Sequence, residues 1–338
     1  MNTEVFFFEA IGILSLSFFL YLFQTPKSVS SFNRNDTIDF VRGLSMIGIV
    51  IIHIHSYFAF FHPKEEVVRY TLSLSNLARF SVPVFILSSG AFLKLGEGYW
   101  QKKLKSLFLP FLLASLLGYF LKYQNKSVLE FVFKFFTGSV FAPYYFVPLL
   151  FQFYLLFQIL RGRIVLPILV LALLLNLVSN LGLIPLPSPF REMSFLNFVF
   201  FFCLGITYKR FFYDPNPKIT SHHWILISAL SVLIVFLSYG LGIELKNHHL
   251  GYPICMFFVL VWIGNQISAN WFKATISYVG KNSIAVFLLH PFVIHLMHMF
   301  DPFALGGPVL GYAITLFLNV AIPLLVWKLL SKTVRVSS

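Results

Sequence analysis

The stretch "IDFVRGLSMIGIVIIHIHSYF", residues 38–58, combines the apolar content of a membrane span with four ionisable side chains. A helix needs about 20 mostly apolar residues to cross the hydrocarbon core of a bilayer, so the length of the stretch fits one crossing. A charged side chain inside such a helix costs about 3 kcal/mol on insertion scales, and it usually marks a pathway or a site. The stretch therefore predicts a transmembrane helix that carries function.

The composition of the whole chain supports a membrane protein. Of its 338 residues 58% are hydrophobic and 11% are charged, whereas about a quarter of the residues of an ordinary soluble domain are charged. The net charge of +13 is spread over short segments, and a nucleic-acid-binding protein would gather it into a patch on a soluble face. We therefore expect a lipid bilayer, and no nucleic acid, as the partner of this surface.

Eleven apolar runs are long enough to be spans, and they lack the alternation of barrel strands. The sequence thus predicts an all-α, polytopic transmembrane helical bundle. The predicted spans are 5–23, 39–60, 77–95, 104–121, 144–160, 164–180, 194–212, 223–240, 251–267, 283–300 and 308–330.

The first span differs from a cleaved signal peptide, because it lacks a basic start and a small-residue cleavage site. We interpret residues 1–30 as one extra N-terminal transmembrane helix and residues 31–338 as a membrane domain with a ten-helix core. Alternate connecting segments hold 16 and 8 Lys and Arg residues. The richer set should face the cytosol. This predicts a multi-pass protein of the cytoplasmic (inner) membrane, with its N-terminus outside and its C-terminus in the cytosol.

The spacing of the ionisable residues predicts a site on one face of the helix. Arg42 and His53 are eleven residues apart, close to three full turns, so they share a face about 16 Å apart along the axis. Asp39 lies one turn before Arg42 on much the same side, whereas His55 faces elsewhere. A cation at the cytosolic edge and a deeper imidazole fit a long anionic donor such as a coenzyme A thioester. A neutral His53 could act as general base or accept the acyl group itself.

At these residues the sequence resembles a known family. "IDFVRGLSMIGIVIIH" is similar to the first-helix signature of the acyltransferase 3 family, integral-membrane O-acyltransferases that modify surface glycans and related acceptors. The family pattern is an acidic residue, an Arg-Gly pair, and a histidine eleven positions after the arginine. The resemblance implies that His53 is the essential histidine, that Arg42 is its partner, and that Asp39 belongs to the same set.

Later segments resemble the family in the same order and cover most of residues 36–330. They are "RFSVPVFILSSGAFL" (79–93), "YYFVPLLFQFYLLF" (144–157), "FFCLGITYKRF" (201–211) and "ISYVGKNSIAVFLLHPFVI" (276–294). The resemblance implies substrate-binding roles for residues within them, namely Arg79, Ser89, Asn282, Ser283 and His290.

One segment departs from the family pattern. The family usually has an Arg-x-x-Arg cluster shortly before a proline, whereas this chain reads "QKKLKSLFLP" over residues 101–110. Lys103 and Lys105 supply charge, and Ser106 occupies the place of a second basic residue. Lysines attract phosphate as point charges, without the two-pronged geometry of arginine. Two interpretations stay open: these lysines bind the donor's phosphates, or they anchor the cytosolic end of a span.

Other uses of the reactive residues are less favoured. His53 and His55 point to different sides of a helix, and no His-Glu-x-x-His pattern occurs, so we expect no metal site and no permanently bound cofactor. Cys203 and Cys255 lie inside predicted spans, where they are expected to be small packing residues without a disulfide.

We therefore expect a membrane O-acyltransferase with His53 as catalytic centre and Arg42 and Asp39 orienting it or the donor. The expected donor substrate is an acyl-CoA, acetyl-CoA in the first place, and the expected acceptor is a carbohydrate-like hydroxyl. The alternative is a membrane transporter of protons or an anionic solute, although the chain lacks the internal repeat that transporters usually show. A non-catalytic export partner is a third interpretation, and a homodimer is left open.

Overall fold

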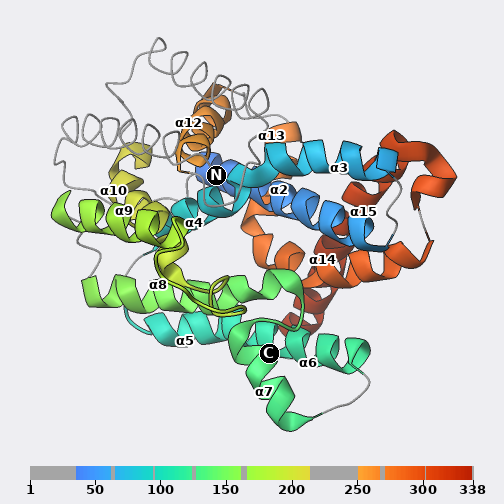
Figure 1. The fold of residues 1–338 in the computed structure, drawn as a ribbon, viewed down its shortest axis with the longest axis horizontal. Coiled ribbons are helices and arrows are strands. Elements are labelled where there is room, and N and C mark those ends of the chain that lie inside the picture. The colour runs from blue at the N-terminus through green and yellow to red at the C-terminus, as the bar shows by residue number, and fades with distance from the viewer. Residues whose placement is uncertain are drawn as a thin grey trace.

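A computed structural model describes residues 36–61, 65–93, 96–123, 127–160, 166–213, 250–266, 271–300 and 302–336. Within these residues every regular element is a helix, which confirms the all-α, polytopic architecture (Figure 1). The helices are α2 (Asp36–Phe61), α3 (Glu65–Leu77), α4 (Ser81–Phe92), α5 (Tyr99–Lys103), α6 (Leu109–Lys122), α7 (Val128–Thr137), α8 (Phe146–Leu160), α9 (Leu166–Asn180), α10 (Val199–Tyr213), α12 (Gly251–Gln266), α13 (Trp271–Lys281), α14 (Ser283–Met297) and α15 (Pro302–Val336).

Four described segments are long and apolar enough to cross a membrane: Asp36–Phe60, Tyr99–Lys122, Ala142–Leu160 and Val309–Leu330. α13 and α14 pass the same test together, although they are bent by 82° at the break between them. Other predicted spans contain shorter helices, with 12 residues in α4 and 15 each in α9 and α10. The predicted spans 5–23 and 223–240, and the predicted domain boundary at residue 30, lie outside the described residues.

Three of the segments that connect the predicted spans contain helices. These connecting segments are 61–79, 122–143 and 268–283, and they include α3, α7 and α13 respectively. With 13, 10 and 11 residues, these helices are too short to span a bilayer. A search for runs of about 20 apolar residues therefore passes over them, although each carries apolar residues at helical spacing.

Paired glycines allow α2 and α13 to pack closely. A Cβ atom added to Gly43 would lie 2.0 Å from the carbonyl oxygen of Ile276, and one added to Gly280 would lie 1.9 Å from the carbonyl oxygen of Asp39. Such distances leave no room for any side chain, so the two backbones touch directly. Small residues at helix contacts favour association inside membranes, because they maximise packing between backbones. The contact fixes the start of α2, and with it Arg42, against the end of α13.

The break between α13 and α14 turns the chain at Asn282. The backbone N–H of Asn282 still donates to the Tyr278 carbonyl at 3.1 Å, and the Asn282 carbonyl accepts the N–H of Ala285 at 3.0 Å. The turn therefore keeps its backbone polar groups hydrogen-bonded, as a membrane interior requires. It places Ser283, the first residue of α14, beside α2.

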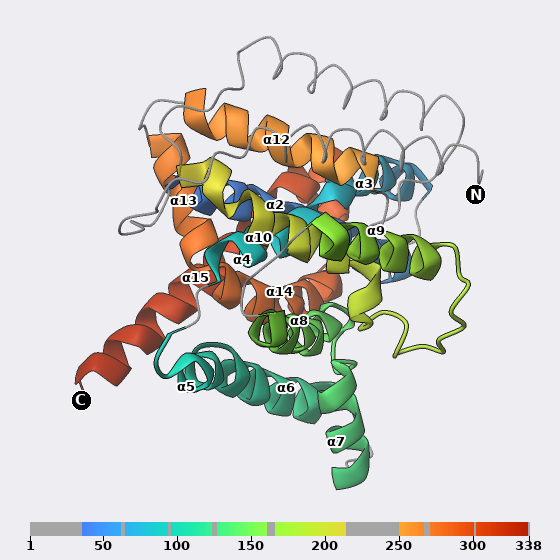
Figure 2. The ribbon, with the colours of Figure 1, turned by 90° about the vertical axis from the view of Figure 1, so that its left-hand side faces the viewer.

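The span Tyr99–Lys122 is built from α5, a π-helical turn over Leu104–Phe108, and α6. Pro110 follows the π-helical turn and has no N–H to donate one turn back, which favours a local change of helical register here. In Figure 2, α5 and α6 form one edge of the described bundle and α12 lies toward the opposite edge.

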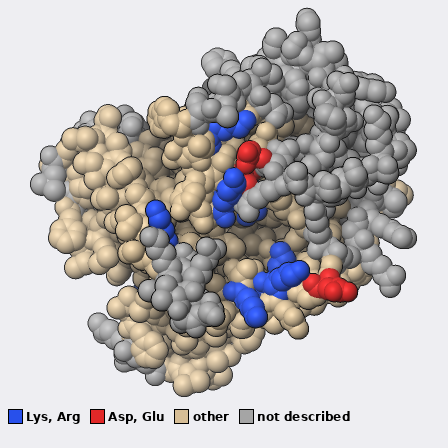
Figure 3. Space-filling model, turned by 180° about the vertical axis from the view of Figure 1, so that it is seen from behind, with Lys and Arg blue, Asp and Glu red and all other residues tan. Residues whose placement is uncertain are grey.

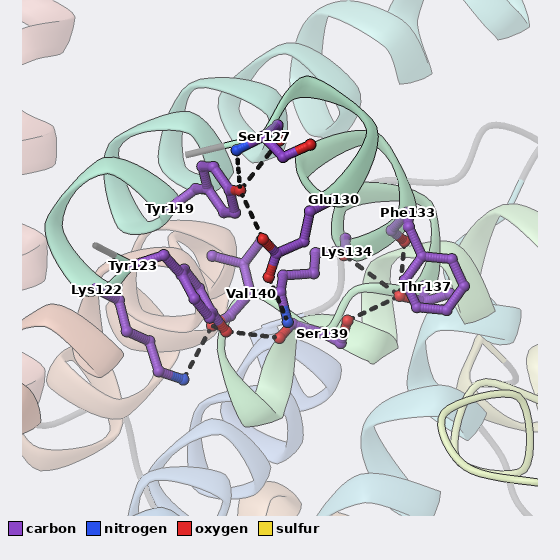
Figure 4. Close-up of polar contacts among 10 residues, drawn as sticks. All are labelled: Tyr119, Lys122, Tyr123, Ser127, Glu130, Phe133, Lys134, Thr137, Ser139 and Val140. Atoms are coloured by element: carbon purple, nitrogen blue, oxygen red, sulfur yellow. Dashed lines mark hydrogen bonds and ion pairs between the residues drawn. The ribbon is translucent and has the colours of Figure 1, made fainter. Parts of the chain in front are cut away.

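α7 projects from the end of α6 (Figure 2), and two of its charged side chains contact Tyr119 and Tyr123. The Tyr119 hydroxyl donates to the Glu130 carboxylate at 3.2 Å, Glu130 pairs with Lys134 at 3.5 Å, and the Lys134 ammonium lies 4.5 Å from the ring centre of Tyr123 (Figure 4). The outward face is apolar and exposed, with Val128, Leu129, Val132, Phe133 and Phe136. A helix with several large apolar side chains exposed is expected to contact lipid.

The described surface also carries few charges. Figure 3 shows a face on which Lys, Arg, Asp and Glu side chains form a few small groups in a mostly uncharged surface. Many exposed side chains are large and apolar, including Leu113 and Leu117 on α6 and Phe317 on α15. A soluble protein rarely exposes so much contiguous apolar surface, whereas lipid tails cover it without penalty.

Candidate active site

α2 carries the ionisable residues and lies among most of the other long elements. It packs against α3, α4, α12, α13, α14 and α15 (Figures 1 and 2). α2 is continuous from Asp36 to Phe61, so Arg42 and His53 keep the axial separation of about 16 Å that an α-helix dictates. The site therefore has two ends, one at each of these residues.

The deep end of the site is a pair of imidazoles. The ring centres of His53 on α2 and His290 on α14 are 5.4 Å apart, with 36° between the ring planes. His290 is fully buried, whereas His53 keeps a partly exposed side chain. Among the described residues, His53 Nδ1 and His290 Nε2 are buried ring nitrogens without a hydrogen-bond partner. The structure thus brings together two residues that lie 237 positions apart in the sequence.

The second imidazole is held by its own helix. His290 Nδ1 lies 2.8 Å from the carbonyl oxygen of Val286. Pro291 follows, and because it lacks an N–H it leaves the Phe287 carbonyl without its usual helical donor. The hydroxyl of Tyr144 donates to the Leu288 carbonyl at 2.6 Å, which ties η3 (Ala142–Tyr145) to this turn. These contacts fix the His290 ring relative to α14.

His55 points away from this pair, as its spacing predicts. Its Nδ1 lies 2.9 Å from the Thr71 hydroxyl on α3. It therefore has a structural partner outside the site.

The other end of the site is formed around Arg42. Its Nη2 donates to the Ser283 hydroxyl at 3.1 Å. The guanidinium carbon lies 5.0 Å from the ring centre of Phe85 and 5.2 Å from that of Phe92. Aromatic faces attract cations, so these two rings help to hold the guanidinium in place. The arrangement places the guanidinium between α2, α4 and α14, nearly two turns from the start of α2.

A second cation lies near the first. The Lys103 ammonium is 4.2 Å from the ring centre of Tyr154 and 5.7 Å from that of Tyr99, and the charge of Arg42 acts on it electrostatically. Like charges repel, so an anion between them would be bound favourably. Lys105 is exposed, and the structure does not bring it into contact with this pair.

Asp39 is fully buried. Its backbone carbonyl lies against Gly280, in the contact between α2 and α13. The nearby acidic residue Asp36 forms an ion pair with Lys281 at 3.0 Å. Asp39 thus lies at the Arg42 end of the site, about 20 Å along the helix axis from His53.

Arg79 lies on the His53 side. Its charge acts electrostatically on His53 and on Tyr145. Glu192, in the connection between α9 and α10, acts on the same tyrosine. Gln152 of α8 holds this connection, because its side chain donates to the Met193 carbonyl at 2.8 Å and accepts the Phe195 N–H at 3.2 Å.

Two predicted binding residues use their side chains locally. The hydroxyl of Ser89 donates to the Phe85 carbonyl of its own helix at 2.7 Å. The side-chain amide of Asn282 donates to the Tyr278 carbonyl at 3.0 Å. Their proposed contacts with substrate stay predictions.

Sequence reasoning missed the aromatic side chains that surround the two cations. Phe85 and Phe92 are seven residues apart, two helical turns, so they share a face of α4. That spacing was a signal available in the sequence. The contact of Tyr154 with Lys103 joins α8 to α5, and no local pattern predicts it.

The described residues include no group of three or more His, Cys, Asp or Glu side chains that could hold a metal ion. Cys203 and Cys255 are buried thiols, and the structure joins neither of them in a disulfide.

One comparison with known proteins gives a match. The model of the acyltransferase 3 family, described as an acyltransferase domain, matches residues 35–328. A search of curated proteins and a search of solved structures find no match. The matched range includes both ends of the site.

Proposed function

Because the chain belongs to the acyltransferase 3 family and is a membrane acyltransferase, we propose that it transfers an acetyl group from cytosolic acetyl-CoA to a hydroxyl of a surface carbohydrate or a related acceptor. The observation that carries this proposal is the arrangement on α2. A partly exposed imidazole, His53, lies about 16 Å along one helix from a guanidinium that aromatic rings hold.

The Arg42 end suits the phosphates of the donor. Arg42 and Lys103 place two cations within electrostatic range of each other, among aromatic rings. Phosphate groups relieve the repulsion between the cations, and the long arm of coenzyme A can then extend toward His53. This end of α2 faces the cytosol of a cell whose cytoplasmic membrane holds the protein, in agreement with the distribution of Lys and Arg.

The His53 end suits the chemistry of acyl transfer. A neutral His53 takes the proton of the acceptor hydroxyl while the hydroxyl oxygen attacks the thioester carbonyl carbon. The carbon–sulfur bond then breaks, and the coenzyme A thiolate leaves with the proton that the imidazole returns. One O–acyl bond replaces one S–acyl bond, so the reaction needs no metal or redox group.

The acceptor reaches His53 from the side of Arg79. The charge of Arg79 acts on both His53 and Tyr145. A guanidinium and a phenol are hydrogen-bonding groups that suit the hydroxyls of a carbohydrate. The connection that holds Glu192 lies next to the same tyrosine, so it forms an outer wall for the acceptor.

The direct test uses the full chain, purified and placed in lipid vesicles with acetyl-CoA and candidate glycans. We expect release of free coenzyme A that depends on the acceptor, together with an acetyl mass increase on the glycan. Mass spectrometry of surface glycans from cells with and without the gene identifies the acceptor and the group together. Solute uptake without any acyl transfer would overturn the proposal in favour of a transporter.

A further inference from the structure

The hydrogen bond that His290 makes decides which of its nitrogens carries the proton. A carbonyl oxygen only accepts, so His290 Nδ1, at 2.8 Å from the Val286 carbonyl, must be the donor. A neutral imidazole has a single N–H. His290 Nε2 therefore carries a lone pair, and this buried atom has no partner among the described residues.

His53 has a buried ring nitrogen that could donate a hydrogen bond to this lone pair. Its buried Nδ1 also lacks a hydrogen-bond partner among the described residues, and its ring lies beside that of His290, with 5.4 Å between the centres. A direct N–H···N bond of about 3 Å joins imidazole centres about 5 Å apart. One proton on His53 Nδ1 would satisfy both nitrogens at once. A buried polar atom without a partner is unfavourable, and this favours the hydrogen-bonded arrangement.

We propose that His290 is a positioning residue that fixes the tautomer of His53, by accepting a hydrogen bond from His53 Nδ1 so that His53 Nε2 is the basic nitrogen that faces the substrate. The inference rests on the proposed function, because it assigns a role within the same reaction. The two nitrogens are not hydrogen-bonded in the structure, and a small rotation of either ring forms the bond as substrate binds. Catalytic hydrogen bonds often tighten in this way when the site is filled.

The proposal also gives a physical role to residues 289–291, Leu-His-Pro, within the stretch 276–294. Nδ1 is the ring nitrogen nearer the backbone, and the Val286 carbonyl on the preceding turn occupies it. Nε2 is the distal nitrogen, so its lone pair extends away from α14. The fixed ring thus presents an acceptor to α2, where His53 supplies the donor. A carboxylate in this place would do the same work at a higher cost of burial inside a membrane.

The test compares three variants of the full chain in lipid vesicles. His290→Leu removes the acceptor and keeps the bulk, and we expect kcat to fall about 100-fold or more while the KM for acetyl-CoA changes less than about twofold. His290→Gln returns an oxygen near the position of Nε2, and we expect it to recover at least about tenfold of that loss. His55→Gln is the matched control on α2, and we expect it to keep wild-type activity.

A packing role for His290 predicts a different order. Leucine would then be tolerated at least as well as glutamine, and this result would overturn the proposal. The nitrogen-15 spectrum of His53 gives a second readout that does not depend on turnover. We expect the Nδ1–H form in the wild-type protein and in His290→Gln, and a mixture of tautomers in His290→Leu. An unchanged spectrum in a folded His290→Leu variant would also overturn it.

The activities of His53→Ala and His290→Leu together distinguish failure of the proposed function from failure of the role proposed for His290. If His53→Ala keeps wild-type acyl transfer, the proposed function fails and the role of His290 fails with it. If His53→Ala is inactive while His290→Leu has normal kcat, only the inference about His290 fails.

Discussion

Two polar clusters of this molecule differ in how completely their atoms are hydrogen-bonded. Between α6 and α7, the Tyr119 hydroxyl, the Glu130 carboxylate and the Lys134 ammonium each contact a partner (Figure 4). Between α2 and α14, the imidazoles of His53 and His290 each leave a buried nitrogen without one among the described residues. Buried polar groups are nearly always hydrogen-bonded, so an exception calls for an explanation. The contrast agrees with the proposal that the second cluster serves chemistry, whereas the first holds α7 against α6.

The largest effect on acyl transfer is expected for His53→Ala. We expect acyl transfer to fall by about 1,000-fold or more, because general base catalysis alone contributes about 100- to 10,000-fold. Coenzyme A release in lipid vesicles measures it. The variant should remain inserted in the membrane, since its ring has no hydrogen-bond partner to lose among the described residues. Wild-type turnover in the purified variant would contradict the assignment.

Arg42→Ala tests the other end of the site. We expect the KM for acetyl-CoA to rise about 10- to 100-fold, because a hydrogen bond to a charged group contributes about 1.5–3 kcal/mol. Initial rates at increasing acetyl-CoA concentrations measure the change. Arg42→Lys keeps the charge and loses the planar group between Phe85 and Phe92, so its KM should lie between the two. A normal KM for acetyl-CoA in Arg42→Ala would show that the donor does not bind at Arg42.

Lys103→Ala should have a smaller effect of the same kind. We expect the KM for acetyl-CoA to rise about fivefold, because exposed or partly exposed charges contribute about 1 kcal/mol to an ionic contact. The effect should weaken at high salt. Lys102→Ala is the matched control, since Lys102 is exposed and adjacent in sequence. Equal changes of KM in Lys103→Ala and Lys102→Ala would indicate that Lys103 only anchors the helix at the membrane surface.

Glu130→Ala tests whether the cluster between α6 and α7 serves stability alone. It removes one of the two acceptors of the Tyr119 hydroxyl, the other being the Ser127 carbonyl at 3.0 Å, and it removes the partner of Lys134. We expect a loss of about 1 kcal/mol of folding stability, because the carboxylate is partly exposed. Thermal unfolding in detergent measures it. Turnover per folded molecule should be unchanged, and a selective fall in kcat would show that this cluster belongs to the site.

The sequence was sufficient for much of the fold and for part of the site. Long apolar runs predict a helical membrane protein. The eleven-residue spacing predicts that Arg42 and His53 share one helix face, and this holds because α2 is unbroken. The neighbour of His53 was not predictable from spacing. His290 reaches it because α14 follows a bend of 82° after α13, and long-range packing sets that angle. α3 and α7 were missed because a criterion of membrane-spanning length excludes short helices.

The bare contact between Gly43 and Gly280 has a mechanical consequence. With no side chain between them, α2 and the end of α13 cannot slide or tilt apart without losing backbone contact. The two helices therefore behave as one rigid unit. The hydrogen bond from Arg42 to Ser283 connects α14 to this unit. We therefore expect a bulky donor to displace α5 and α8, which meet through Lys103 and Tyr154, more easily than it separates α2 from α13.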